Sequence, residues 1–304
     1  MAVQTRTIRR RIKSVTNTRK ITKAMELVAA SKMRKAMQSV LGTRPYSQLA
    51  WNAITSISSK IDTNLHPLLQ ERKDVKRVLL LLITSDRGLA GGFNTNIIRK
   101  TLEQIRVMED GVEIQTICIG KRGADAMRRA NQSILASFTD ITNNTRFEEV
   151  LPIGRMVIHE FTHGDFDRVF IAYTDFVSAI TQKPIILELL PLGTPEQSQV
   201  LKNMNEMDGK NESSILSVSE YTFEPSPQEV LDRILPRLVE TMIYQAVLES
   251  AASEHSSRMM AMRSSSDAAS DMISDLTFTY NQARQAGITQ EIAEISSGKA
   301  ALES

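Results

Sequence analysis

A chain of 304 residues that is 41% apolar and 24% charged is long enough to bury a hydrophobic core, and it fits one or two structural units. Its longest strongly apolar run, Val78 to Ile83, is far shorter than the ~20 residues that cross a bilayer, so no membrane-spanning helix is expected. The single cysteine, Cys118, excludes a disulfide within the chain and is expected to be a buried, inert thiol.

Charge is distributed unevenly, although the net charge is only +2. Residues 1–60 contain 13 Lys or Arg and one acid, Glu26, whereas residues 226–304 contain 6 Lys or Arg and 11 acids. Opposite charges at the two ends favour their pairing, although exposed ion pairs contribute only ~0–1 kcal/mol each. A basic, acid-poor start is also typical of a mitochondrial presequence, but the helical pattern continues through it without a break.

The first predicted element is a helix from residue 3 to about residue 58. Strong helix formers dominate it, and a kink is expected at Gly42 and Pro45. One helical stripe is predicted to face a partner helix: Ile8, Ile12 and Val15, continued by Met33, Ala36 and Val40. Between Ile21 and Ala30 the apolar residues point almost all the way round, so one partner helix cannot cover this section.

Short apolar runs separated by helical patterns follow and predict a compact α/β domain with a largely parallel sheet. The predicted strands are Val75–Thr84, Val112–Ile119, Arg168–Thr174 and Pro184–Leu190, and the predicted helices are Asn96–Met108 and Phe147–Phe161. The polar stretch from Gly193 to Ser219 is expected to be a surface loop.

The last predicted element is a second long helix. Ser226 is its expected N-cap and Pro227 its first residue, and it extends to about Leu302 with interruptions at Pro236 and Gly287. Its predicted stripes are Leu231, Ile234, Leu235, Leu238, Met242 and Ala246, then Met272, Leu276, Tyr280 and Ala283. If the two long helices are antiparallel, the Ala- and Ser-rich stretch 251–270 lies opposite residues 29–36, where small side chains let the backbones approach. The domain is then an insertion between two helical arms.

The sharpest local motif is Thr84-Ser85-Asp86-Arg87-Gly88-Leu89-Ala90-Gly91-Gly92-Phe93-Asn94, which follows an apolar strand and precedes a helix. Its glycines are compatible with phosphate binding, but the P-loop Gly-Lys-Ser/Thr and the dinucleotide G-x-G-x-x-G spacing are missing. A tight strand-to-helix connection is the preferred interpretation, and a nucleotide-binding enzyme with helical arms is the alternative.

No other pattern predicts catalysis or a cofactor. The histidines have no recurring ligand spacing apart from His159 and His163, which are four residues apart, and no nucleophile motif occurs. The basic first helix, which contains Arg9, Arg10 and Arg11, is compatible with a basic coiled-coil nucleic-acid-binding protein. The preferred interpretation is that these charges bind an acidic protein surface. The alternative that they are only solvated, with no partner, is not excluded by the sequence.

Three stretches resemble the gamma subunit of F-type ATP synthases, of the bacterial type. The first is the run from Ile8 to Met33, IRRRIKSVTNTRKITKAMELVAASKM. The second is Ser85-Asp86-Arg87-Gly88-Leu89 with Gly91-Gly92-Phe93-Asn94, and the third is the run from Tyr280 to Glu291, YNQARQAGITQE. The resemblance spans the whole chain and is highly specific.

This resemblance implies an α+β fold, with a long antiparallel coiled coil of N- and C-terminal helices and an inserted Rossmann-like α/β domain. The expected segments are a shaft helix over 1–60, the inserted domain over 61–224 and a second shaft helix over 225–304. The implied function is that of a central rotor shaft, without catalytic residues or cofactors, coupling rotation of a proton-driven membrane ring to conformational cycling of the beta subunits.

The implied partners are the alpha and beta subunits, the epsilon subunit and the membrane c-ring, with no nucleic acid. The resemblance places the protein peripherally at the cell membrane, on its cytoplasmic side, with the mitochondrial matrix side less favoured. It also implies contact residues, without catalytic roles.

Lys20, Lys23 and Met25 belong to a segment that meets an acidic loop of the beta subunits in the family. Arg284, Gln285 and Thr289 match positions that contact the surrounding hexamer. Tyr221 and Glu224 match a segment near the ring.

Two departures from the family pattern give further expectations. Pro236 lies where relatives have an uninterrupted helix, which predicts a kink. The loop from Gly193 to Ser219 contains no cysteine, so the thiol regulation associated with chloroplast relatives is not expected.

Overall fold

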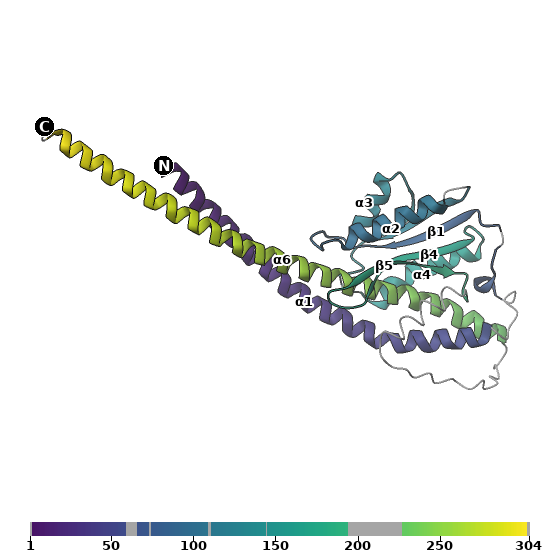
Figure 1. Ribbon diagram of the computed structural model, residues 1–304. Coiled ribbons are helices and arrows are strands. Elements are labelled where there is room, and N and C mark those ends of the chain that lie inside the picture. Colours follow the sequence, from purple (N-terminus) through teal and green to yellow (C-terminus); the bar gives the residue numbers. More distant parts are fainter. Residues whose placement is uncertain are drawn as a thin grey trace. The chain divides into compact units, whose positions relative to one another are not determined.

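Long helices form the first and last elements of the protein. The computed structural model describes residues 2–58, 66–72, 74–108, 111–143, 145–193 and 227–302. Helix α1 spans Ala2–Ser58 and helix α6 spans Pro227–Leu302, with proline at its first position as predicted (Figure 1). The segment boundaries expected at 60/61 and 224/225, the Ser226 cap and nearly all of the loop expected over 193–219 lie outside the described residues.

Both long helices continue through the residues at which a break or kink was expected. Helix α6 includes Pro236 and Gly287, and helix α1 includes Gly42 and Pro45. The predicted interruption of α6 is therefore wrong. A proline removes one backbone N–H donor, and here Leu235 and Leu238 on either side of it are fully buried, which holds the helical path.

The sheet has five strands in the order β3-β2-β1-β4-β5. Strands β1 (Arg77–Ile83), β2 (Glu113–Ile119), β3 (Ser133–Phe138) and β4 (Arg168–Phe176) are parallel, and β5 (Gln182–Leu190) is antiparallel to β4. The prediction of a largely parallel sheet inside an α/β domain is confirmed.

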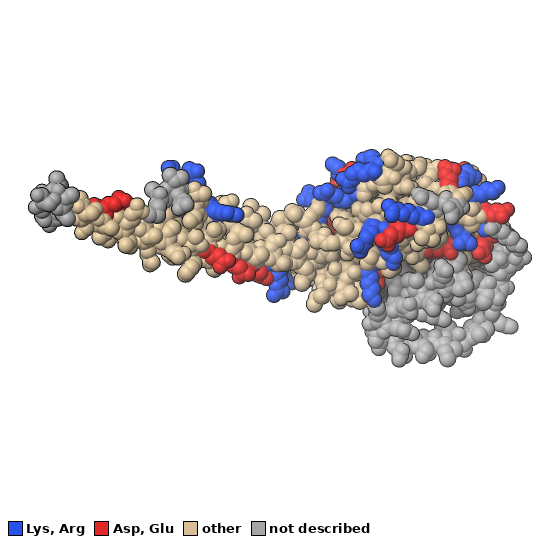
Figure 2. All heavy atoms as spheres, turned by 45° about the horizontal axis from the view of Figure 1, so that its top comes forward, with Lys and Arg blue, Asp and Glu red and all other residues tan. Residues whose placement is uncertain are grey.

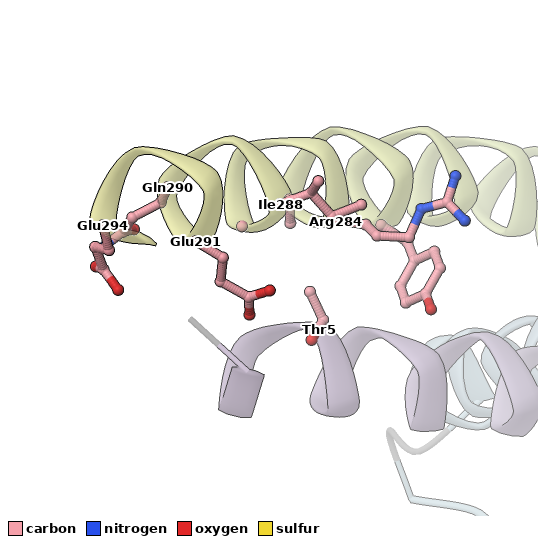
Figure 3. Close-up of a pocket in the computed structure, with 9 residues that line it drawn as sticks. Thr5, Arg284, Ile288, Gln290, Glu291 and Glu294 are labelled. Carbon is pink, nitrogen blue, oxygen red and sulfur yellow. The ribbon is translucent and has the colours of Figure 1, made fainter. Parts of the chain in front are cut away.

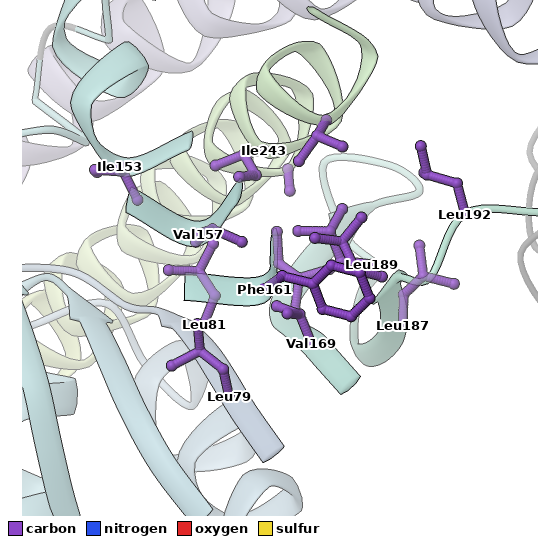
Figure 4. Packing of buried hydrophobic residues seen from close by; sticks show 14 of the residues in the cluster. Leu79, Leu81, Ile153, Val157, Phe161, Val169, Leu187, Leu189, Leu192 and Ile243 are labelled. Atoms are coloured by element: carbon purple, nitrogen blue, oxygen red, sulfur yellow. The ribbon is translucent and has the colours of Figure 1, made fainter. Parts of the chain in front are cut away.

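Helices cover both faces of this sheet (Figure 1). On one face, Val78, Leu80 and Leu82 of β1 pack against helices α2 (Phe93–Met108) and α3 (Lys121–Arg129). On the other face, the alternate residues Leu79 and Leu81 pack with helix α4 (Phe147–Thr162) and with the first turns of α6, as Figure 4 shows. Because β1 is buried on both faces, its residues are apolar without alternation. This continuous apolar run made it the clearest strand in the sequence.

The sequence did not predict strand β3 or helix α3. Strand β3 alternates exposed and half-buried residues at the edge of the sheet, so its apolar signal is weak. Helix α3 is short and rich in charge, and it buries small residues such as Gly123 and Ala124 rather than a stripe of large ones. Its preceding residue, Gly120, has a φ of 96°, and a Cβ there would lie 2.2 Å from the carbonyl oxygen of Thr84.

The chain divides into two compact units. Unit 1 comprises Met1–Ala30 with Arg258–Ser304, and unit 2 comprises Ser31–Ser257. In unit 1 Arg19 donates a hydrogen bond to the Ser270 hydroxyl at 3.4 Å, and in unit 2 the Thr43 hydroxyl donates to Gln245. In unit 1 the start of α1 at Thr5 lies beside residues 284–294 of α6, further along α6 than Ser270, and in unit 2 Val40 packs with Ala252 while Thr43 bonds Gln245. Within each unit α1 is therefore antiparallel to α6, as predicted.

Small residues of α6 serve both the helix pair and the sheet. Ala252 is fully buried in a cluster with Val40 of α1, and the half-buried Ala36 packs against the same cluster, so small residues of both helices meet there as predicted. Ser250 Oγ accepts a hydrogen bond from the Thr174 N–H at 3.1 Å, and the Ser253 hydroxyl donates to the Thr174 carbonyl at 3.2 Å. Part of the serine-rich stretch therefore satisfies backbone groups of β4, a role that helical periodicity alone did not reveal.

Candidate partner-contact surface

A narrow stripe of side chains joins α1 and α6 in unit 1. On α1, Ile8, Ile12 and Val15 are half-buried as predicted, and Ala29 is 2% exposed. On α6, Met262 and Ala269 are buried. Of the stripe predicted further along α6, Leu276, Tyr280 and Ala283 are half-buried as expected, but Met272 is 46% exposed and Ile273 is half-buried in its place. The covered positions of α6 are spaced alternately three and four residues apart, as in a coiled coil, and Met272 lies outside that spacing.

Outside this stripe, large apolar side chains are exposed on both helices of unit 1. On α1, Ile21 and Leu27 are 61% and 62% exposed, and on α6 Phe278 and Ile295 are 72% and 74% exposed. Exposed apolar patches on an otherwise folded surface mark interaction sites. The prediction that one partner helix cannot cover the Ile21–Ala30 section is confirmed, since Val28 is also 58% exposed.

The predicted contact residues of α1 lie on and beside this uncovered surface. Lys20 and Lys23 are exposed, whereas Met25 is half-buried. The Lys23 ammonium lies 3.0 Å from the Glu26 carboxylate, one turn further along the helix. Because Glu26 is the one acid of the first 60 residues, most of the basic charge on α1 has no neighbouring acid on its own helix.

The predicted contact residues of α6 form a second, separate set. Arg284, Gln285 and Thr289 are all exposed, and the Thr289 hydroxyl donates to the Gln285 carbonyl at 3.0 Å. Arg284 lies about 20 Å of helix axis beyond Ser270, at 1.5 Å per residue, whereas Ser270 is bonded to Arg19 beside Lys20. The structure thus brings together Lys20 with Lys23, and Arg284 with Gln285 and Thr289, but not the two sets with each other.

A groove of about 350 Å³ lies beside Arg284, between the start of α1 and the end of α6 (Figure 3). Thr5 of α1 and Glu291 of α6 point toward each other across it, and Gly287, Ile288 and Glu294 also line it. No sequence motif predicted this groove, because it arises from helix pairing. The last two predicted contact residues, Tyr221 and Glu224, lie outside the described residues.

On the face shown in Figure 2, a few separate basic and acidic groups lie along the paired helices, and charged side chains are denser over the α/β part.

The loop that raised the nucleotide-binding alternative uses its polar groups internally. It joins β1 to α2, as the preferred interpretation predicted. The Asp86 carboxylate accepts hydrogen bonds from the backbone N–H groups of Lys121, at 3.0 Å, and Asp140, at 2.9 Å. The Asn94 side-chain oxygen accepts from the Ser85 N–H at 3.0 Å. A carboxylate of the chain itself therefore lies at the N-terminus of α3, where a bound phosphate would otherwise be stabilised.

Two further titratable groups of the α/β domain, His66 and Cys118, are buried. His66 caps the short 3-10 helix η2 (Pro67–Leu69) through a 3.1 Å hydrogen bond from the Leu68 N–H to its Nδ1. Cys118 is buried as predicted, and burial raises the pKa of its thiol to about 12. Within the described part of the chain, no group of three or more His, Cys, Asp or Glu side chains is arranged to hold a metal ion.

None of the helices in the described ranges has the length and apolar character of a membrane span.

Comparisons with known proteins agree with the resemblance found in the sequence. The family model described as ATP synthase matches residues 4–302. The ATP synthase gamma chain of Xanthomonas campestris is 41% identical over 298 residues, covering 98% of this chain and 99% of the relative. That of Dehalococcoides mccartyi is 42% identical over 299 residues, covering 98% of both chains.

Solved structures give the same picture. A chain of the central stalk and c-ring structure of Tetrahymena thermophila mitochondrial ATP synthase is 26% identical, with a TM-score of 0.59 over 80% of this chain and 98% of that one. A chain of the Euglena gracilis mitochondrial ATP synthase, 20% identical, has a TM-score of 0.66 over 99% of this chain and 95% of that one, which supports the fold. The chain therefore belongs to the ATP synthase family, among its gamma chains.

Proposed function

We propose that the exposed surface of unit 1 is where this protein meets the alpha and beta subunits, with Lys20 and Lys23 facing an acidic loop of the beta subunits. Arg284, Gln285 and Thr289 form a second contact set on α6. Tyr221 and Glu224 contact the region near the membrane ring, and the protein lies on the cytoplasmic side of the membrane.

The role that this surface serves follows from the family. The protein is the central rotor shaft of an F-type ATP synthase, and it couples rotation of the proton-driven membrane ring to conformational cycling of the catalytic beta subunits. It is a non-catalytic, peripheral subunit whose partners are the alpha, beta and epsilon subunits and the c-ring. None of the comparisons described above supports the nucleic-acid-binding alternative.

One observation carries the contact proposal: unit 1 leaves large apolar side chains exposed on both helices. Ile21 and Leu27 on α1, and Phe278 on α6, are each more than half exposed. Each helix of the pair covers only one side of the other, so the apolar side chains on the remaining sides need to be covered by other molecules. A ring of subunits around the helix pair would cover these other sides. The basic residues beside Ile21 would attract an acidic surface of those subunits.

The double substitution Lys20→Glu/Lys23→Glu tests this assignment. Acidic side chains would face an acidic partner loop, so we expect proton-coupled ATP synthesis in membrane vesicles to fall several-fold. Lys23→Glu also places an acid three residues before Glu26. Repulsion between these two like charges costs the helix only a few tenths of a kcal/mol.

The matched control is Lys20→Arg/Lys23→Arg, which keeps both charges and should retain most of the coupled synthesis. Circular dichroism of the isolated chain should be the same for both double variants. ATP synthesis at the wild-type rate by the glutamate variant would contradict the proposed contact.

A further inference from the structure

The end of helix α4 carries a motif that the rotor role leaves unused. Residues 159–163 read His-Glu-Phe-Thr-His, which has the H-E-x-x-H spacing that places two imidazoles on one helical face. The four-residue spacing of His159 and His163 alone did not favour a metal site. The structure shows how the two rings are arranged.

The two imidazole rings are neighbours on the exposed side of α4. Their centroids are 3.9 Å apart, and the ring planes differ by 22°. Both histidines are exposed, whereas Phe161 between them is fully buried in the core. The buried phenylalanine anchors this turn of the helix, so the spacing of the two rings is set by a well-packed backbone.

A hydrogen bond fixes which nitrogen of His163 is available. Its Nδ1 lies 3.0 Å from the carbonyl oxygen of His159, and a carbonyl oxygen can only accept. Nδ1 therefore carries the proton, and Nε2 of the neutral ring holds a free electron pair. Metal-binding histidines commonly donate their second nitrogen to a backbone carbonyl or a carboxylate in this way. The Nδ1 of His159 is 3.9 Å from the Glu160 carboxylate, which is too far for a hydrogen bond.

The two rings are close enough for one ion to be shared. Two nitrogens that each bind the same metal ion at ~2.0–2.1 Å lie about 3 Å apart. Because the stacked rings direct their electron pairs nearly parallel, the two exposed side chains must rotate about their own bonds for both nitrogens to meet one ion.

We propose that His159 and His163 bind one divalent transition-metal ion through their Nε2 atoms, with water in the remaining positions. Imidazole ligands suit Cu²⁺, Ni²⁺ and Zn²⁺, and Cu²⁺ binds most tightly of the three. The site supplies two protein ligands, because no third His, Cys, Asp or Glu joins them within the described part of the chain. It is a binding site only, since a metallopeptidase of this motif needs a third protein ligand.

The experiment titrates Cu²⁺ and, separately, Ni²⁺ into the full-length chain without an affinity tag, using calorimetry. We expect one ion per chain. His159→Gln and His163→Gln should each weaken binding at least tenfold, because a chelating pair becomes a single ligand. The glutamine amide can still donate to the carbonyl at 159, so circular dichroism of the His163 variant should be unchanged. Wild-type affinity in either variant would overturn the proposal.

Two controls separate this pair from other ligands. Glu160→Gln should change the affinity less than threefold, and a loss as large as that of His163→Gln would contradict a donor set of two imidazoles. His66 and His255 are 8% and 3% exposed and are retained in the double variant His159→Gln/His163→Gln, so binding that survives in that variant would overturn the assignment. In the Cu²⁺ complex of the wild type, electron paramagnetic resonance should show coupling to two imidazole nitrogens, and coupling to one would also overturn it.

Discussion

The two compact units of this protein bury their apolar residues to different extents. In unit 2, Leu79 and Leu81 of β1 are fully buried between helices on the two faces of the sheet. In unit 1, the buried stripe is narrow, and Leu27 and Phe278 are 62% and 72% exposed. Unit 2 is therefore stabilised by its own core, whereas the surface of unit 1 needs other molecules to cover it.

In this non-catalytic subunit, the difference in burial indicates which surface carries the function. The polar groups of unit 2 that resemble a ligand site, such as Asp86 and Asn94, are bonded to the chain itself. The functional surface is instead the part whose side chains lack intramolecular cover.

The largest expected effect comes from the same substitution made once in each unit. Leu81→Ala removes a fully buried side chain from unit 2 and should lower the free energy of unfolding by about 2–5 kcal/mol. Leu27→Ala in unit 1 should change it by less than about 0.5 kcal/mol, because that side chain is already exposed. Denaturant unfolding of the isolated chain measures both, and a loss at Leu27 as large as that at Leu81 would remove the contrast.

An intermediate effect is expected where the two long helices pack closely in unit 2. Ala252 is fully buried against Val40, so Ala252→Leu inserts a side chain into space that is already filled. Overpacking should cost about 1–3 kcal/mol. Ala252→Ser is the matched small substitution and should cost less. Equal thermal midpoints for the leucine variant and the wild type would show that the helices are not in close contact there.

The smallest expected effect is a pH dependence that belongs to unit 2. Burial pushes the pKa of Asp167 up, but hydrogen bonds from the Lys76 and Arg77 N–H groups and the Arg72 guanidinium outweigh it, so its pKa lies below the usual range. A carboxyl with a depressed pKa stabilises the fold above its unfolded pKa, about 3.9, and this contribution is lost as the pH falls through the lower folded value.

We therefore expect Asp167→Asn to be less stable than the wild type at pH 6, with the difference shrinking below about pH 4. Unfolding free energies measured from pH 6 to pH 2.5 test this. A difference that stays constant across this range would show that the Asp167 carboxylate does not contribute through its charge.

The sequence predicted the elements with the strongest periodic or apolar signals. Strands β1, β2, β4 and β5, helices α2 and α4 and both long helices were expected close to their observed bounds, because each contains an apolar run or a long stripe. Strand β3 and helix α3 were missed because Ser133–Phe138 is a half-exposed edge strand and Lys121–Arg129 buries small residues. The interruption expected at Pro236 did not occur because the packing of the neighbouring leucines determines the helical path there.

The contact surface was only partly predictable. The apolar residues of Ile21–Ala30 exceeded what one partner helix can cover, and this was visible in the sequence. Met272 was assigned to the stripe wrongly: Ile273 is three residues before Leu276 and so fits the coiled-coil spacing, whereas Met272 does not. The groove beside Arg284 could not be predicted because it needs both helices, and the orientation of the His163 ring depends on its hydrogen bond to the His159 carbonyl.

The most direct test of the central claim is thiol labelling before and after assembly with the alpha and beta subunits. The one native cysteine, Cys118, is buried with a pKa raised to about 12, so it contributes little background. Leu27→Cys and Phe278→Cys report on unit 1, and Val107→Cys, at an 80% exposed position of unit 2, is the control. We predict that maleimide labels all three rapidly in the isolated chain, and that assembly slows labelling several-fold at positions 27 and 278 but not at 107. Unchanged labelling rates at positions 27 and 278 in the assembled complex would contradict the account.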